Sequence, residues 1–343
     1  MQKNNGIALK FVKYILSFLF AFFIIYLLFR NQDPVELFRE ISEVKIGWVM
    51  LSMVFGAWSY IIRGLRWIVL IEALGYKSSK KNSIISVSVG YFTNLFIPRA
   101  GELSRCTTLN QTEDIPINKL FGTILIERVI DVIFLFSFMI LTLLLKFPDI
   151  ISLYNRVQEQ SDGRNNYYKI LLFLSVILLL IILYHFLKKR IKRLSFYKQV
   201  KDFFVGLKEG FKSINNIKRK STFWVQTFSI WIMYFLMTYV CFFCMDDTSR
   251  LGISDGLFLL VLVGVGMLIP TPGGIGSYHV IVMIGLTVLG VGFINLDSTI
   301  VDYNPALLFP TIMHAAQTLV AIIMGLISLG LIFTAKKKKY GSP

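Results

Sequence analysis

The sequence predicts an all-α integral membrane protein, and three observations support that class. Hydrophobic residues make up 55% of the 343 residues, and the mean hydropathy is +0.65. Charged residues make up 16%, compared with about 25% in soluble domains. Several apolar runs are near or above the ~20 residues that a helix needs to cross a bilayer. We expect one polytopic membrane domain over residues 1–343, with about six full transmembrane helices plus two broken or re-entrant helical hairpins in an inverted-repeat arrangement.

The formal charge of +16 would suggest nucleic-acid binding in a soluble protein. Here the lysines and arginines lie between apolar spans, so the positive-inside rule and contact with anionic lipid headgroups explain them better. We therefore expect membrane lipids as partners and no nucleic acid. The oligomeric state is not predicted.

The three cysteines are Cys106, Cys241 and Cys244. An odd number, with two inside an apolar span, argues against a disulfide framework. Cys241 and Cys244 have the spacing of a metal or redox pair, but no second ligand pair lies at a suitable spacing, and two small apolar residues one helical turn apart are the simpler interpretation. We expect no metal and no cofactor.

The N-terminal part carries Lys3, Lys10 and Lys13, which indicates a cytoplasmic N-terminus. The first span is expected at Tyr14–Phe29, retained because no small-x-small cleavage site follows it. An outer segment with a short helix capped by Asp33-Pro34 comes next.

The second span is expected at Ile46–Leu70, where Arg63 and Arg66 share one face near the inner end. The basic residues after it, around Lys80, place that end in the cytoplasm. A broken segment follows over residues 82–118. Its sequence NLFIPRAGELSR, Asn94–Arg105, has Pro98 and Gly101 at the break and carries Arg99, Glu102 and Arg105. Pro removes a backbone donor and Gly loosens the backbone, so a helix should break here.

Lys119–Leu145 is the next expected span and opens with Glu127, Arg128 and Asp131. Residues three and four apart are neighbours on a helix, so an ion pair within this helix is expected. Charges inside a membrane are costly unless they are paired or wet, which marks a candidate functional site. A buried pair that only fixes helix packing is the alternative.

The second half begins with a span at Lys169–Leu187 and a very basic, amphipathic segment at residues 188–220. That segment is expected on the inner leaflet, with a solvated linker helix as the alternative. Spans at Thr222–Cys244 and Ala306–Thr334 enclose a second broken segment over residues 256–295. Its break reads LIPTPGGIGSYH and contains Pro270, Pro272, Gly273, Gly274, Gly276 and His279.

Charge distribution tests this topology. If the first broken segment crossed the membrane once, the basic residues of 188–220 would lie outside, against the positive-inside rule. If each broken segment returns to its own side, the first hairpin opens inward and the second opens outward. Lys336–Lys339 then anchor a cytoplasmic C-terminus. Transporters use such inverted repeats to build a site at mid-membrane.

With these residues in place, the chain resembles the lysyl-phosphatidylglycerol synthase transmembrane region, the flippase half of the bacterial multiple peptide resistance factor. The resemblance covers nearly the whole chain. The matching motifs are Arg63-x-x-Arg66-Trp67, Asn94-x-x-x-Pro98-Arg99-x-Gly101-Glu102-x-x-Arg105, Glu127-Arg128-x-x-Asp131 and Pro270-x-Pro272-Gly273-Gly274-x-Gly276. It implies a flippase-like protein of the bacterial cytoplasmic membrane.

Two features depart from that family. His279 stands where the family usually has Glu, which would alter proton coupling or headgroup preference, although a hydrogen-bonded packing role is equally open. The synthase proper also has a cytosolic aminoacyl-transfer domain, which we do not expect in this chain.

The first functional hypothesis is a flippase-like transporter, not an enzyme, that moves a phospholipid or lipid-linked anionic headgroup. Helix starts at the breaks and the arginines would bind its phosphate. The expected binding set is Arg63, Arg66, Asn94, Arg99, Glu102, Arg105 and Arg128, with Glu127 and Asp131 as charge partners and His279 and His314 as possible members.

Two alternatives come from other classes. One is an integral-membrane transferase acting on a lipid phosphate, with Glu102, His279 or His314 as catalytic candidates. The other is a structural or regulatory membrane subunit. His314, near Gln317 on one face of the last span, could line a cavity or make an interhelical hydrogen bond.

Overall fold

The structure is a computed structural model that describes residues 2–160, 217–269, 271–293 and 303–340. These residues form helices joined by short links and contain no strand. Four helices are long and apolar enough to cross a membrane: α3 (Ile46–Ala73), α6 (Ile117–Gln160), α9 (Lys220–Cys241) and α13 (Pro305–Tyr340). The predicted all-α membrane class is confirmed. The span expected at Lys169–Leu187 and most of the basic segment 188–220 lie outside the described residues, as does Pro270.

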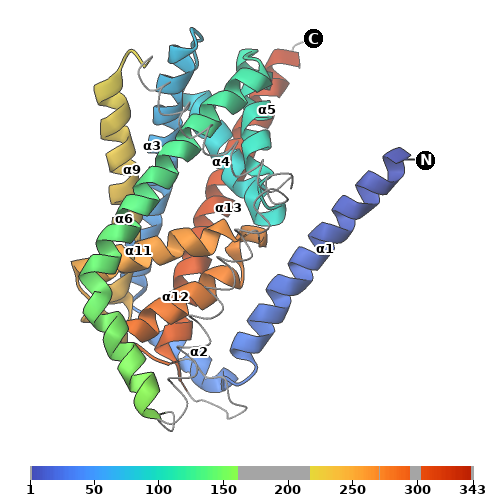
Figure 1. Ribbon diagram of the computed structural model, residues 1–343. Coiled ribbons are helices and arrows are strands. Elements are labelled where there is room, and N and C mark those ends of the chain that lie inside the picture. The colour runs from blue at the N-terminus through green and yellow to red at the C-terminus, as the bar shows by residue number, and fades with distance from the viewer. Residues whose placement is uncertain (1, 161–216, 270, 294–302, 341–343) are drawn as a thin grey trace, which may run out of the picture.

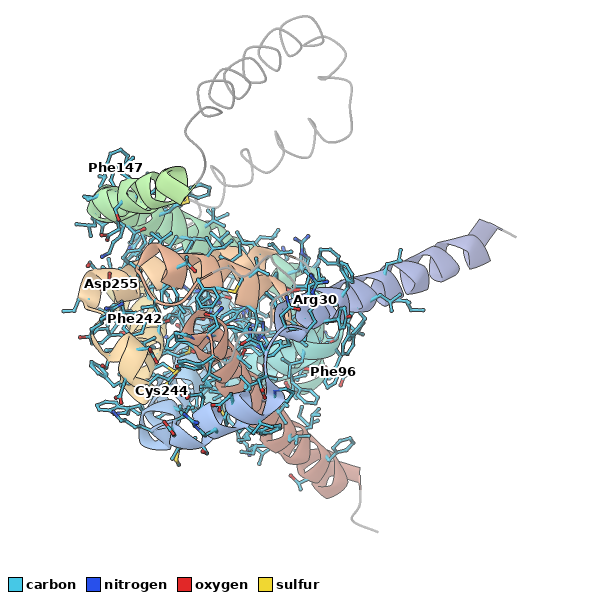
Figure 2. The ribbon with its side chains drawn as sticks, turned by 90° about the horizontal axis from the view of Figure 1, so that it is seen from below. Arg30, Phe96, Phe147, Phe242, Cys244 and Asp255 are labelled. Atoms are coloured by element: carbon cyan, nitrogen blue, oxygen red, sulfur yellow. The ribbon has the colours of Figure 1, made fainter. Side chains whose placement is uncertain are left out.

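The first two helices are α1 (Gln2–Phe29) and α2 (Pro34–Glu43). The expected cap is present, because the Asp33 carboxylate accepts hydrogen bonds from the backbone N–H groups of Val35, at 2.7 Å, and Glu36. The N-terminal part of α1 stands away from the other helices in both views (Figures 1 and 2).

The long helices run between two ends of a bundle. We call the end that holds the start of α3 the lower end and the end that holds its last turn the upper end, as drawn in Figure 1. At the lower end Lys45 pairs with Asp246, and at the upper end Arg219 pairs with Glu72. Figure 2 shows the molecule from below, with Phe242, Cys244 and Asp255 on one side. The core there is apolar and includes Phe242 and Phe309.

The first broken segment folds as two antiparallel helices, α4 (Lys80–Phe96) and α5 (Gly101–Glu113). At its open, upper end the Glu113 carboxylate accepts hydrogen bonds from Ser79 N, at 3.1 Å, and from the Asn82 amide, at 2.6 Å. Near its tip Gly90 faces Gly101 so closely that neither has space for a Cβ. Glycine therefore permits the contact between the two limbs.

The second broken segment comprises α11 (Ile253–Leu268), a short 3-10 turn η3 (Pro272–Gly274) and α12 (Ser277–Val288). It follows η2 (Phe242–Cys244) and α10 (Asp246–Ser249) at the lower end. Gly273, Gly274 and Gly276 all have positive φ, which explains why the break is built from glycine.

The first hairpin opens at the upper end, and the second opens toward α10, where Arg250 donates a hydrogen bond to the carbonyl oxygen of Gly290. The tips of the two hairpins approach each other. A Cβ on Gly273 would lie 3.5 Å from the side chain of Leu95, near the end of α4. The predicted interruptions are therefore present as breaks between helices. How each hairpin sits in a bilayer stays a prediction.

One helix is longer than expected. The span predicted to end at Leu145 continues as α6 to Gln160, with Pro148 inside it. Lys146 lies between Asp149, three residues later on the same helix, and Asp255 of α11, which supports the helix beyond the apolar run. One part of α6 therefore contacts the start of the second hairpin through Lys146, and the part nearer its N-terminus carries Glu127 and Asp131.

Candidate functional site

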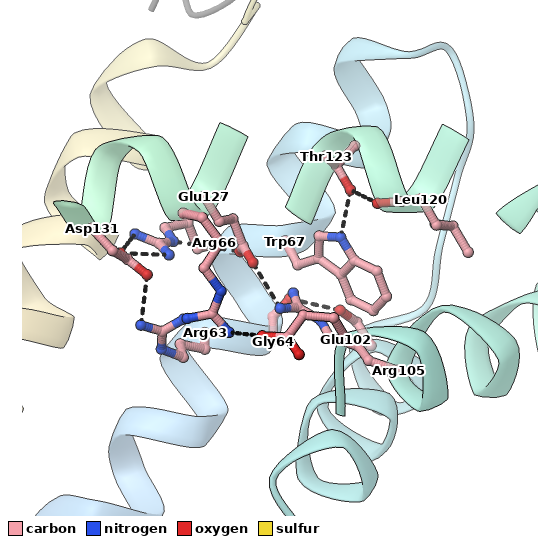
Figure 3. Close-up of polar contacts among 12 residues, drawn as sticks. Arg63, Gly64, Arg66, Trp67, Glu102, Arg105, Leu120, Thr123, Glu127 and Asp131 are labelled. Atoms are coloured by element: carbon pink, nitrogen blue, oxygen red, sulfur yellow. Dashed lines mark hydrogen bonds and ion pairs between the residues drawn. The ribbon is translucent and has the colours of Figure 1, made fainter. Parts of the chain in front are cut away.

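Charged side chains from α3, α5 and α6 meet inside the upper half of the bundle (Figure 3). Arg63 and Arg66 lie one turn apart on α3, and both reach Asp131 of α6. Arg63 Nη2 lies 2.8 Å from Asp131 Oδ2, and Arg66 Nη2 lies 3.2 Å from Oδ1. Asp131 therefore binds both arginines, one with each carboxylate oxygen.

Glu127 lies one turn before Asp131 on α6 and is buried. Its Oε2 accepts a hydrogen bond of 2.7 Å from Nη1 of Arg105, which comes from α5. Its Oε1 lies 3.6 Å from Arg66 Nε, close enough for ionic attraction but too far for a hydrogen bond. Arg66 thus contacts both carboxylates. We call Arg63, Arg66, Arg105, Glu127 and Asp131 the buried ion network.

Neutral groups complete the surroundings. On α9, Tyr234 accepts a 2.6 Å hydrogen bond from Arg63 Nε, and Thr227 accepts a longer one, 3.4 Å, from Arg66 Nη1. The guanidinium carbon of Arg105 lies 3.8 Å from the ring centroid of Trp67. Trp67 is itself fixed by donating to Thr123 Oγ1 at 2.7 Å. These contacts hold three guanidinium groups in place without adding negative charge.

The buried ion network carries one more positive charge than negative, with three arginines and two carboxylates. Arg105, which is 6% exposed, is the arginine of this network with two hydrogen-bond donors left over. Its Nε and Nη2 are buried and have no hydrogen-bond partner among the described residues. These two nitrogens form one edge of the planar guanidinium, the edge that binds a carboxylate or phosphate through two parallel hydrogen bonds. This edge therefore has the donor geometry that a planar or tetrahedral anion requires.

The other predicted residues lie outside this network. Arg128 is half-exposed and hydrogen-bonds Glu102 at 2.7 Å. Arg99 is exposed and lies in the link between α4 and α5 with a φ of 64°. Asn94 holds the first hairpin together, because its Oδ1 accepts a 2.7 Å hydrogen bond from Gly101 N. The structure brings together three of the five predicted arginines.

The predicted ion pair of Asp131 with a neighbouring residue of α6 is wrong. Asp131 pairs with Arg63 and Arg66 of α3, and Arg128 pairs with Glu102 of α5. The two α3 arginines occupy both oxygens of Asp131, so interhelical pairs replace the local one.

Sequence reasoning missed three neutral members of the site. Trp67 belongs to a motif already singled out, next to Arg66, but its contact with Arg105 was not expected. Tyr234 and Thr227 lie on α9, more than a hundred residues from the arginines they contact, and no local pattern marks them.

At the second break, His314 of α13 fixes the turn. Its Nε2 lies 2.8 Å from the carbonyl oxygen of Gly273, so the interhelical hydrogen bond is present. His279 of α12 faces His314, with ring centroids 5.0 Å apart. Glu102, the other catalytic candidate, is held by Arg128. Gln317 donates to Ser52 Oγ at 3.2 Å and ties α13 to α3.

Comparisons with known proteins agree on the class of protein. The family described as the lysylphosphatidylglycerol synthase TM region matches residues 14–325. A curated protein, UPF0104 membrane protein MJ1595 from Methanocaldococcus jannaschii, is 32% identical over 126 residues. That match covers 36% of this chain and 36% of the relative, so the chain spans about a third of the relative's length. No solved structure was found to match.

Proposed function

Because the chain belongs to the family of the lysylphosphatidylglycerol synthase TM region, we propose that it is a lipid flippase-like transporter rather than an enzyme. Its substrate is a phospholipid or another lipid with an anionic, phosphate-bearing headgroup. The binding site is the buried ion network, and the lipid tails stay in the bilayer while the headgroup enters.

The free edge of Arg105 is the observation that supports this proposal. A buried guanidinium with one paired nitrogen and two unpaired ones is costly, because each unsatisfied donor loses its hydration without compensation. A phosphate diester carries one negative charge, which would balance the extra positive charge of the buried ion network. Its two free oxygens would accept hydrogen bonds from the two adjacent donors, Nε and Nη2 of Arg105. A ligand of this type would make the buried ion network neutral and saturate Arg105.

The carboxylates have a separate role in this proposal. Without a lipid, Glu127 and Asp131 compensate two of the three arginines and keep them in position. Their presence limits the attraction for the phosphate, so the lipid is bound but can leave. A transporter needs both properties, because a headgroup held too tightly would not be released on the other side.

The proposed membrane is the bacterial cytoplasmic membrane. The upper end of the bundle faces the cytoplasm, together with both termini, because Lys336–Lys339 lie at the end of α13 there. The first hairpin then enters from the cytoplasm and the second from the outside, and their tips meet between the leaflets.

The test uses purified protein in liposomes that contain a phosphatidylglycerol with a fluorescent acyl chain, and it measures how much becomes accessible to an impermeant reductant. Protein-containing liposomes should expose more label than empty ones, and Arg105→Gln should remove the difference. Arg39→Gln is the matched control, since Arg39 lies exposed on α2. No lipid movement by the wild-type protein would contradict the function, and normal movement by Arg105→Gln would contradict the site.

A further inference from the structure

Two buried imidazoles, one from α12 and one from α13, meet beside the second break and take no part in the buried ion network. His279 and His314 are both buried, and their ring centroids are 5.0 Å apart. His314 Nε2 must donate to the carbonyl oxygen of Gly273, because a carbonyl only accepts. When His314 is neutral, its Nδ1 is therefore left with a lone pair that can take up a proton.

Among the residues that the structure describes, no side chain caps the first turn of α12, which Gly276 precedes. The backbone N–H groups of a first turn have no partner within their own helix. The hydroxyl of Ser277 hydrogen-bonds the hydroxyl of Thr271 and the carbonyl oxygens of Gly266 and Gly274, so it does not cap the helix. Helical side chains lean toward the N-terminus, so His279 lies along this uncapped turn. Its Nδ1 is buried and has no hydrogen-bond partner among the described residues.

We propose that the start of α12 binds a phosphate group together with one proton, which the His279–His314 pair takes up. This inference rests on the proposed function, because the phosphate is that of the same lipid headgroup at a second point on its path. The backbone N–H groups of the first turn and the positive end of the helix dipole provide the anion contact.

The proton follows from charge balance. The titratable group in ring contact with both imidazoles is Tyr278 of α12, and Cys241 of α9 lies beyond it. Within the described part of the chain, neither imidazole forms an ion pair: His314 is hydrogen-bonded to the carbonyl oxygen of Gly273, and His279 Nδ1 has no partner. A lone buried imidazolium would lack a counter-ion, and a lone phosphate would lack a cation. Bound together they are neutral, so each should bind better in the presence of the other.

The experiment observes the imidazoles directly. The chain contains three histidines, and the third, His185, can be replaced by Gln, which leaves two imidazole signals. The full chain carrying His185→Gln and nitrogen-15-labelled histidine is placed in phosphatidylcholine nanodiscs at about pH 6, near the ordinary range of His. Phosphatidylglycerol is added in one arm and inorganic phosphate in the other, and nitrogen chemical shifts report the protonation state.

We expect phosphatidylglycerol to change the nitrogen chemical shifts of one imidazole from those of the neutral form to those of the charged form. Added phosphatidylcholine should leave that imidazole neutral. A response to inorganic phosphate as well would support a site for phosphate in general. With His279→Gln, proton uptake by His314 should be lost. With His314→Asn the effect should be smaller, and proton uptake by His279 should fall. Unchanged shifts in both arms would overturn the proposal.

The two proposals fail separately. If the protein moves no lipid but its imidazoles become protonated when phosphatidylglycerol is added, the transport function is contradicted and the α12 site is supported. Protein that moves lipid while its imidazoles stay neutral in both arms would contradict the α12 site alone.

Discussion

The guanidinium of Arg105 lies over the ring of Trp67, with 3.8 Å between the guanidinium carbon and the ring centroid. Trp67 is wholly buried and is held by its hydrogen bond to Thr123. A ring face attracts a cation and offers no formal charge in return. The contact therefore orients Arg105 while leaving its free edge able to bind an anion.

Trp67→Leu should lower stability more than Trp67→Phe does. Both changes remove the hydrogen bond to Thr123, worth about 1 kcal/mol, and both leave a cavity, which is larger for Leu. Phe keeps a ring face beneath Arg105, whereas Leu removes it. Thermal unfolding in detergent, followed by intrinsic fluorescence of the other tryptophans, measures the difference. Equal midpoints for the two variants would show that the ring does not support Arg105.

Glu127→Gln should be more harmful than the double change Glu127→Gln with Arg105→Gln. The single change leaves Arg105 without a counter-ion, and breaking a buried pair in this way costs about 3–5 kcal/mol. The double change removes the orphaned charge together with its partner. The order of the unfolding midpoints tests this prediction, and a double variant less stable than Glu127→Gln would contradict the pairing.

Gly101→Ala should disrupt the first hairpin. An added Cβ would lie 2.5 Å from the Asn94 amide nitrogen and would also meet the carbonyl oxygen of Gly90. The change should lower the unfolding midpoint and reduce lipid movement. Gly122→Ala is the matched control, because nothing lies within 4 Å of a Cβ there, and replacing a helical glycine should add up to about 1 kcal/mol. Equal effects at both positions would rule out the close approach of the limbs.

Lys146→Met should destabilise the protein more than Lys45→Met. Lys146 is buried between Asp149 and the partly buried Asp255, so its loss leaves the Asp255 carboxylate without a cation between α6 and α11. The pair of Lys45 with Asp246 is exposed, and exposed pairs contribute about 0–1 kcal/mol. Unfolding midpoints of the two variants compare the pairs directly, and a larger loss for Lys45→Met would show that the contact of Lys146 is not structural.

Much of the architecture could be predicted from local chemistry. Asp33 before Pro34 marks a helix start, and the helix breaks near Pro98 and Gly101 and at Pro272–Gly274 follow from missing donors and flexible backbone. Such features act within a few residues, so the sequence expresses them directly.

The assembly of the site could be predicted only in part. Arg99 and Arg105 look equivalent in sequence, because both flank the same break. Helix phase separates them: Arg105 lies in the second turn of α5 and is directed to α6, whereas Arg99 occupies the link and stays exposed. That phase depends on the approach of Gly90 to Gly101, which a single sequence does not reveal.

The most direct measurement of the central claim is magnetic dephasing of arginine nitrogen-15 signals by lipid phosphorus-31. The labelled protein is studied by solid-state nuclear magnetic resonance in phosphatidylglycerol bilayers. We expect dephasing of the Nε and Nη2 signals of Arg105, absent in Arg105→Lys and unchanged in Arg39→Gln. Identical dephasing in the wild-type protein and in Arg105→Lys would show that no lipid phosphate binds the free edge of Arg105, and would contradict the account.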